Sequence, residues 1–269
     1  VALVWWELKT DKPLLDLKIF KNWNFTFGTI VLTMLFGVAY GTIAMLPQFL
    51  QNLLGYDSFL SGLAAGPMGF GTMSGVMFCA VTSKKMDLRH QVLFGIIIFS
   101  IGCLMFSNLN LNIALPNVVI PNIVLGVGMT SIIIPGTTLL FSTVSKQEMT
   151  NASSIQNLIK NVGCAVGTSS VGFLVSSYSQ IYQSYLVDKL TPLNEVFYGK
   201  VAAMQAQFMN MGMDYGTALG AAQGKIYGQL VQQSTLCAFT NAYKIYALAI
   251  IILIPFVFIL RKFNAKPEK

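Results

Sequence analysis

The feature that most constrains this chain is the recurrence of long apolar runs. Six such stretches occur, at about 25–46, 59–81, 91–107, 117–141, 150–176 and 236–260. A helix needs about 20 predominantly apolar residues to cross the hydrocarbon core of a bilayer. Charged residues make up only 10% of the chain, against about a quarter in soluble domains. The sequence therefore predicts an all-α integral membrane protein with six transmembrane helices.

Positive charge predicts how these helices are oriented, because Lys and Arg beside membrane spans favour the cytoplasmic side. They cluster before the first span, after the second and after the sixth: Lys9, Lys12, Lys18, Lys21; Lys84, Lys85, Arg89; Arg261, Lys262, Lys266, Lys269. Lys146 follows the fourth span, and the turns after the first and third spans carry none. We expect both chain ends in the cytoplasm. The net charge of +7 then fits a membrane surface better than nucleic acid.

The spans define the expected domain organisation. Residues 1–24 are expected to be the end of a preceding helix followed by a cytoplasmic amphipathic connector, so the chain is interpreted as a fragment. Residues 25–269 form the six-helix unit, with an extracytoplasmic segment at 178–233 before the last helix. That segment shows helical periodicity at 195–211 and 215–231. The third span has little to offer a ligand and is placed against lipid.

The fifth span differs from the others because it carries polar residues in its middle. Lys160 lies about ten residues, or roughly 15 Å, past the start of the span. A charge at that depth is costly and usually has a partner or lines a water-filled cavity. The alternative is a lysine that extends along its flexible stem to the interface. We favour a cavity role; Gln156, Asn157 and Asn161 nearby are cavity-facing or make interhelical hydrogen bonds.

Other spans offer weaker candidates. Asn122, Thr130 and Tyr40 are further cavity candidates, although packing explains each of them at least as well. Asp87 and Arg89 are candidates for a cytoplasmic gate or for a helix cap. Hinge or helix-packing roles are assigned to Gly62, Gly66, Pro67, Gly126, Pro135, Gly163 and Gly167, because small residues let membrane helices approach closely.

Several classes of function find no support in the sequence. The four cysteines show neither metal nor disulfide spacing and suit buried, unreactive thiols. No phosphate-binding glycine loop, catalytic triad or metal cluster is present, so neither an enzyme nor a cofactor is predicted. All ten acidic residues lie outside the centres of the spans. A proton-carrying carboxylate within the membrane, if one is needed, must come from elsewhere.

Short motifs in a fixed order resemble a known family. They are Pro13–Leu17 in the connector, Leu46–Gln51 and Gly55–Tyr56 after the first span, Ser61–Ala64 and Pro67–Gly69 in the second, Asp87–Arg89, Pro121, Gly126, Gly128 and Pro135–Thr138 in the fourth, and Asn151–Ser154 with Gly163 and Gly167 in the fifth. Their order and spacing resemble the fourteen-helix drug:proton antiporter family of the major facilitator superfamily, typified by EmrB and QacA. The likeness covers nearly the whole chain.

This resemblance implies a fold and a function. The six helices would form the C-terminal half of a transporter as two inverted three-helix repeats. The complete protein would export hydrophobic small molecules by proton antiport and alternating access, from a Gram-negative inner membrane. Its expected partners are the N-terminal half, a periplasmic adaptor and an outer-membrane channel. The family often has arginine at the position of Lys160. A lysine lacks the planar guanidinium group with which arginine can bind a partner through two hydrogen bonds.

Two alternatives remain open from the sequence. The chain could be a truncated, non-transporting membrane module or a scaffold that contacts partners through residues 178–233. It could also belong to a carrier of the same fold that is specific for one solute.

Overall fold

The computed structural model of the protein describes residues 17–83, 85–111, 116–188 and 195–259. Within these ranges, six helical stretches are long and apolar enough to cross a membrane: Trp23–Leu53, Ser58–Thr82, Leu88–Phe106, Pro116–Phe141, Met149–Val187 and Tyr215–Ile259. The prediction of six transmembrane helices is confirmed. Of the predicted connector, only a 3-10 turn at Leu17–Lys21 lies within the described residues.

The first spanning helix, α2 (Trp23–Gln48), is anchored by Asn22, whose side-chain oxygen accepts from the backbone N–H groups of Asn24 and Phe25. The Asn22 amide also donates to the carbonyl of Thr143 at 3.1 Å, which joins the start of α2 to the chain just after the fourth span. Pro47 lies inside the last turn of α2. The helix then continues as a π-helical segment, Phe49–Leu53.

The second and third spans follow. The second is divided into α3 (Ser58–Ala65) and α4 (Pro67–Thr82), with the break at Gly66. Proline suits the first position of a helix, because the backbone N–H that it lacks would have no partner within the helix there. Asp57 caps α3 by accepting from the Leu60 N–H at 2.7 Å. The third span, α5 (Leu88–Phe106), is capped by Asp87.

The second set of three begins with α6 (Pro116–Phe141), which stays a single helix through Pro121 and Pro135. It continues with α7 (Met149–Val187) and ends with α9 (Tyr215–Ile252) and the short α10 (Ile254–Ile259). A separate helix, α8 (Glu195–Asn210), lies between α7 and α9.

The two sets of three helices exchange packing partners. The middle helix of the first set, α4, packs against α6, and the middle helix of the second, α7, packs against α2. The members of each pair run parallel, since contact positions rise together along both chains: Gly71 meets Ile123 and Gly75 meets Val127, while Gly163 meets Thr33 and Gly167 meets Gly37. This reciprocal arrangement is that of two inverted three-helix repeats.

The third span was placed against lipid; α5 exposes Ile97, Ile101 and Leu104 on one face, and its other face is covered by helices. It packs against α6, α9 and α10, and Ile96, Phe99 and Phe106 on it are fully buried. Phe106 stacks on Tyr243 of α9 with 5.1 Å between the ring centroids. Lipid tails are as apolar as leucine, so an apolar helix surface does not reveal whether lipid or another helix covers it.

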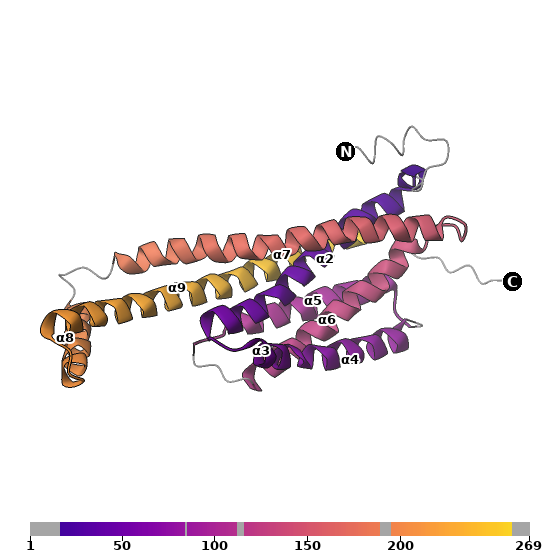
Figure 1. Ribbon diagram of the computed structural model, residues 1–269. Coiled ribbons are helices and arrows are strands. Elements are labelled where there is room, and N and C mark those ends of the chain that lie inside the picture. The colour runs from indigo at the N-terminus through magenta and orange to yellow at the C-terminus, as the bar shows by residue number, and fades with distance from the viewer. Residues whose placement is uncertain (1–16, 84, 112–115, 189–194, 260–269) are drawn as a thin grey trace.

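The ends of α7 and α9 extend far past the other helices and form a hairpin that α8 closes at its tip (Figure 1). The predicted helices at 195–211 and 215–231 are present, but the second is the first part of α9 and not a separate element. Two side-chain pairs hold α7 to α9 along the hairpin: Ser179 with Thr235 at 3.2 Å, and Gln183 with Tyr227 at 2.8 Å.

The turn at the tip is defined by its helix caps. Gly212 has φ +94° and follows α8, and the Met213 N–H bonds back to the Phe208 carbonyl at 3.3 Å, which is the pattern of a helix closed by a left-handed glycine. Asp214 then begins α9 by accepting from the Gly216 and Thr217 N–H groups. The hydroxyl and backbone hydrogen bonds from Thr217 lower the pKa of the Asp214 carboxyl.

Candidate functional site

Lys160 lies on α7 about 16 Å along the axis from the start of that helix. Its ammonium donates to Asn157 Oδ1 at 2.9 Å and lies 5.5 Å from the centre of the Phe36 ring on α2. Tyr40 follows one turn along α2, with its ring centroid 6.3 Å from that of Phe36. The structure therefore brings Lys160, Asn157 and Tyr40 together, and it adds Phe36 to them.

Neither of these contacts neutralises the positive charge of Lys160. An amide oxygen and an aromatic face are both uncharged, and the attraction between a cation and a ring is weaker than an ion pair at the same depth. The acidic residues that the structure describes all lie at helix ends, as caps or in a first turn: Asp57, Asp87, Glu148, Asp188, Glu195 and Asp214.

Gln156 and Asn161 lie near Lys160 in sequence but in different surroundings. Gln156 is 4% exposed, and neither atom of its amide has a hydrogen-bond partner among the described residues. Asn161, like Asn157, is exposed. A buried amide without a hydrogen-bond partner is costly.

Glycines bring α7 and α2 into backbone contact beside this cluster. A Cβ on Gly37 would lie 2.9 Å from the Gly163 carbonyl oxygen, and Gly163 and Gly167 likewise face Thr33 and Gly37. The hydroxyls of Thr29 and Thr33, on the same helix, are buried without a partner among the described residues. Gly37, Gly163 and Gly167 thus form a close backbone contact between α2 and α7.

The candidates in α6 serve the packing of α4. Asn122 is 3% exposed, and its amide donates to the Ala64 carbonyl at 2.7 Å, beside the break at Pro67. Neighbouring helices commonly bind carbonyls freed by a proline in a membrane helix. Thr130 donates to its own helix, at the Gly126 carbonyl. Both residues therefore lie in the contact between helices rather than beside Lys160.

The remaining glycines and prolines divide into covered and uncovered positions. Gly126 faces α4 so closely that a Cβ there would meet the backbone of Met68 and Thr72, and Pro135 is buried. Gly62 has no atom of another segment within 4 Å, and Gly66 is close only to carbonyls of its own turn. The α3–α4 stretch thus carries glycines that no described residue covers.

The two gate candidates lie together at the start of α5. Asp87 is the N-terminal cap of the helix, and its carboxylate accepts from the Arg89 backbone N–H at 3.4 Å. Both side chains are half-buried. Elsewhere in the described residues, no three His, Cys, Asp or Glu side chains gather as a metal site would require.

Sequence reasoning did not identify three residues that shape this region. Phe36 supports Lys160, and its spacing of four from Tyr40 was the available signal. Tyr246 on α9 donates to the Gly167 carbonyl at 2.8 Å, and Ser170 lies 2.6 Å from the same hydroxyl. Spacing within one helix could not reveal this bond, because it joins positions 79 residues apart.

Residues 4–168 match the family model described as Major Facilitator Superfamily. Among curated proteins, the chain is similar to the probable multidrug resistance protein EmrY of Escherichia coli, with 27% identity over 94% of this chain and 48% of the relative. It is also similar to the fatty acid resistance protein FarB of Neisseria gonorrhoeae (28%, covering 94% and 48%). A third relative is the lincomycin resistance protein LmrB of Listeria innocua (28%, covering 66% and 38%). The chain spans about half the length of the curated relatives it matches most fully.

Proposed function

Because the chain belongs to the major facilitator superfamily, we propose that it is the C-terminal half of a secondary transporter that works by alternating access. The resemblance to the drug:proton antiporter family is confirmed by the relatives. The half-length match to these relatives and the pair of inverted three-helix repeats support the assignment to one half. The other half is then the principal partner of this chain.

The uncovered polar face of α7 carries this proposal. Asn157, Asn161 and Thr168 are exposed, as is Gly172, and their spacings of four, seven and four residues place them on one side of the helix. Exposed amides facing hydrocarbon would be costly. This face therefore requires water or another polar surface, which a second six-helix half and the cavity between the halves would provide.

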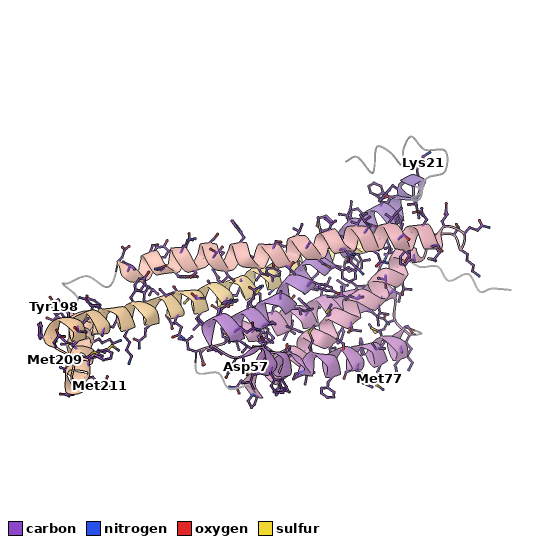
Figure 2. The ribbon with its side chains drawn as sticks, in the orientation of Figure 1. Lys21, Asp57, Met77, Tyr198, Met209 and Met211 are labelled. Atoms are coloured by element: carbon purple, nitrogen blue, oxygen red, sulfur yellow. The ribbon has the colours of Figure 1, made fainter. Side chains whose placement is uncertain are left out.

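The α3–α4 stretch offers the matching face on the other repeat. Gly62 and Gly69 have open space where a Cβ would be, and Phe70 and Met77 are 72% and 65% exposed. Met77 points away from the bundle on the uncovered side of α4 (Figure 2). Since α4 and α7 are equivalent helices of the two repeats, the second half would contact both of them.

Lys160 is proposed as a cation of the substrate cavity. It is held by uncharged groups, so it can attract a negative charge from the other half or from a substrate. The carboxylate that would carry protons is proposed to lie in the other half, and the proton gradient would drive transport without a cofactor. Gln156, Asn161 and Tyr40 are proposed to line the same cavity.

The substrate class follows from the relatives. Their names refer to resistance against compounds as different as fatty acids, lincomycin and colistin. We therefore propose hydrophobic small molecules as the substrates, exported across a bacterial inner membrane with both ends of this chain in the cytoplasm. A carrier specific for one solute would instead accept only one member of a chemically varied substrate panel.

Transport by the complete protein in proteoliposomes tests this proposal. Efflux of a fluorescent hydrophobic cation and of a long-chain fatty acid should collapse when a protonophore removes the proton gradient. Lys160→Ala should reduce efflux by about tenfold or more, the equivalent of one lost charge interaction, and Lys160→Arg should retain most of it. Lys244→Ala is the matched control, because Lys244 is an exposed lysine on α9. Full efflux by Lys160→Ala would remove that residue from the mechanism, and protonophore-resistant efflux would exclude proton antiport.

The projecting hairpin supports a second proposal, that α7, α8 and α9 bind a periplasmic adaptor leading to an outer-membrane channel. Tyr198, Met209 and Met211 lie at its tip (Figure 2) and are 60%, 43% and 68% exposed. A photo-crosslinking residue in place of Tyr198 should trap an adaptor in cells, and one in place of Ile97 on α5 should not. Cross-linking without efflux by the complete protein would favour the scaffold alternative.

A further inference from the structure

A groove lies between α2, α7 and α9. Its volume is about 520 Å³, and its lining includes Met34 and Val38 of α2, Val162 and Val166 of α7, and Ala249 of α9. Three hydroxyl side chains are in this lining: those of Ser170 and Tyr246 bond to each other, and that of Thr33 is buried. The lining is therefore mostly apolar and suits an apolar ligand.

The groove exists because its floor has no side chains. Gly37, Gly163 and Gly167 form it where α2 and α7 touch. Tyr246 joins α9 to α7 at one end of the groove. Past that point the chain leads to α10, where Phe256 lies 6.3 Å from Phe27 of α2. The walls are thus fixed by contacts at both ends.

The groove opens away from the candidate transport site. Successive residues of an α-helix are about 100° apart, so Met34 is on nearly the opposite side of α2 from Phe36, which contacts Lys160. The same reasoning separates Val166 from Thr168 on α7. One side of the α2–α7 pair is therefore polar, and the other, which contains the groove, suits lipid.

An exposed apolar stripe connects the groove to the membrane surface. Trp23, Ile30 and Met34 are 63%, 49% and 52% exposed, and spacings of seven and four residues place them along one face of α2. The stripe ends at Trp23 and at Lys21, which is exposed at the far end of the molecule from the hairpin (Figure 2). Tryptophan favours the membrane interface, and lysine there attracts anionic lipid headgroups.

The length of this stripe matches one leaflet of a bilayer. Eleven residues separate Trp23 from Met34, which is about 16 Å along a helix, and half of a hydrocarbon core is about 15 Å. We propose that an anionic phospholipid lies along this stripe, with its headgroup beside Lys21 and Trp23 and the end of an acyl chain in the groove at Met34. Close packing on the glycine floor and the charge of Lys21 distinguish this lipid from those that exchange freely.

This inference depends on membrane insertion and not on the proposed transport. It is tested by native mass spectrometry of the complete protein released from nanodiscs that contain equal amounts of phosphatidylglycerol and phosphatidylcholine. The wild type should retain phosphatidylglycerol preferentially after graded removal of lipid. Lys21→Gln should reduce that preference by about fivefold, the contribution of one lysine near an anionic surface.

Two tryptophan substitutions test the groove itself. Val166→Trp and Met34→Trp fill it from side chains that are 65% and 52% exposed, so neither should disturb folding, and each should abolish the retained phospholipid. Ile101→Trp, at a 44% exposed position of α5, should retain it. The proposal is overturned if both groove variants keep the lipid as the wild type does, or if Ile101→Trp loses it equally. Unchanged preference in Lys21→Gln would remove the headgroup assignment.

Discussion

The contact between α5 and α6 predicts that Gly128→Ala destabilises the protein. A Cβ at Gly128 would lie 2.5 Å from the Phe99 backbone nitrogen and 2.7 Å from its Cα, whereas ordinary contact begins at 3.4 Å. The obstacle is backbone, so one helix must move by almost 1 Å. Overpacking of this kind costs about 1–3 kcal/mol, and alanine returns at most about 1 kcal/mol of helix propensity. The expected net loss is about 1–2 kcal/mol, which corresponds to a fall in Tm of roughly 2–8 °C.

The matched control is Gly224→Ala in α9. Gly224 is also inside a helix, but no atom of the described residues lies within 4 Å of the position of its Cβ, so only the gain in helix propensity applies. Thermal unfolding in detergent can be followed with a thiol-reactive fluorophore, because Cys103 is fully buried and reacts once the helices separate. The reasoning is refuted if Gly128→Ala melts at or above the wild-type temperature, as Gly224→Ala should.

Three smaller changes have defined outcomes in the same protein. Asn122→Ala leaves the Ala64 carbonyl without its 2.7 Å partner, a loss of about 1–3 kcal/mol, and an unchanged melting temperature would contradict it. Tyr246→Phe removes a 2.8 Å hydrogen bond to a backbone carbonyl and should cost about 0.5–1.5 kcal/mol in the same melt. Asp214→Ala should reduce helicity measured by circular dichroism at neutral pH. Because the bond from Thr217 lowers the pKa of the Asp214 carboxyl, the wild-type advantage is present above the unfolded pKa and disappears as pH falls through the lower folded pKa. A difference in helicity between the wild type and Asp214→Ala that persists in strong acid would contradict this role of Asp214 as the helix cap.

Much of the fold was accessible from the sequence because membrane insertion leaves a strong pattern. Apolar runs located all six spans, and Pro67 located the break between α3 and α4. Glycine spacing also indicated that helices approach closely, as Gly163 and Gly167 do. These features depend on one segment at a time, which is why they can be found without knowing the partners.

What the sequence did not provide depends on pairs of segments. The face of α5 that packs on other helices could not be distinguished from its exposed face, since helices and lipid are both apolar surroundings. The ends of α7 and α9 were also misplaced, because hydropathy marks the edge of the bilayer and not the end of a helix. Asn122 shows the same limit within the site, since its partner at Ala64 is 58 positions away.

The candidate site was predicted in part for a similar reason. Lys160 was identified by its depth in an apolar helix, and this argument needs no partner. Its support from Phe36 required knowledge that α2 and α7 run side by side. Gln156 illustrates the opposite outcome, since its amide is buried without a partner among the described residues, although its sequence position resembles that of its exposed neighbour Asn157.

The long α7–α9 hairpin has a mechanical consequence. The 39 residues of α7 measure about 58 Å, so about 40 Å of helix lies between the bilayer midplane and the tip. A tilt of about 10° in this helix bundle would then carry the tip sideways by about 7 Å on an arm of that length. Because α7 also carries Lys160, the proposed alternating access would make the hairpin a lever, which would convert a small rotation near the centre of the membrane into a larger displacement of its tip.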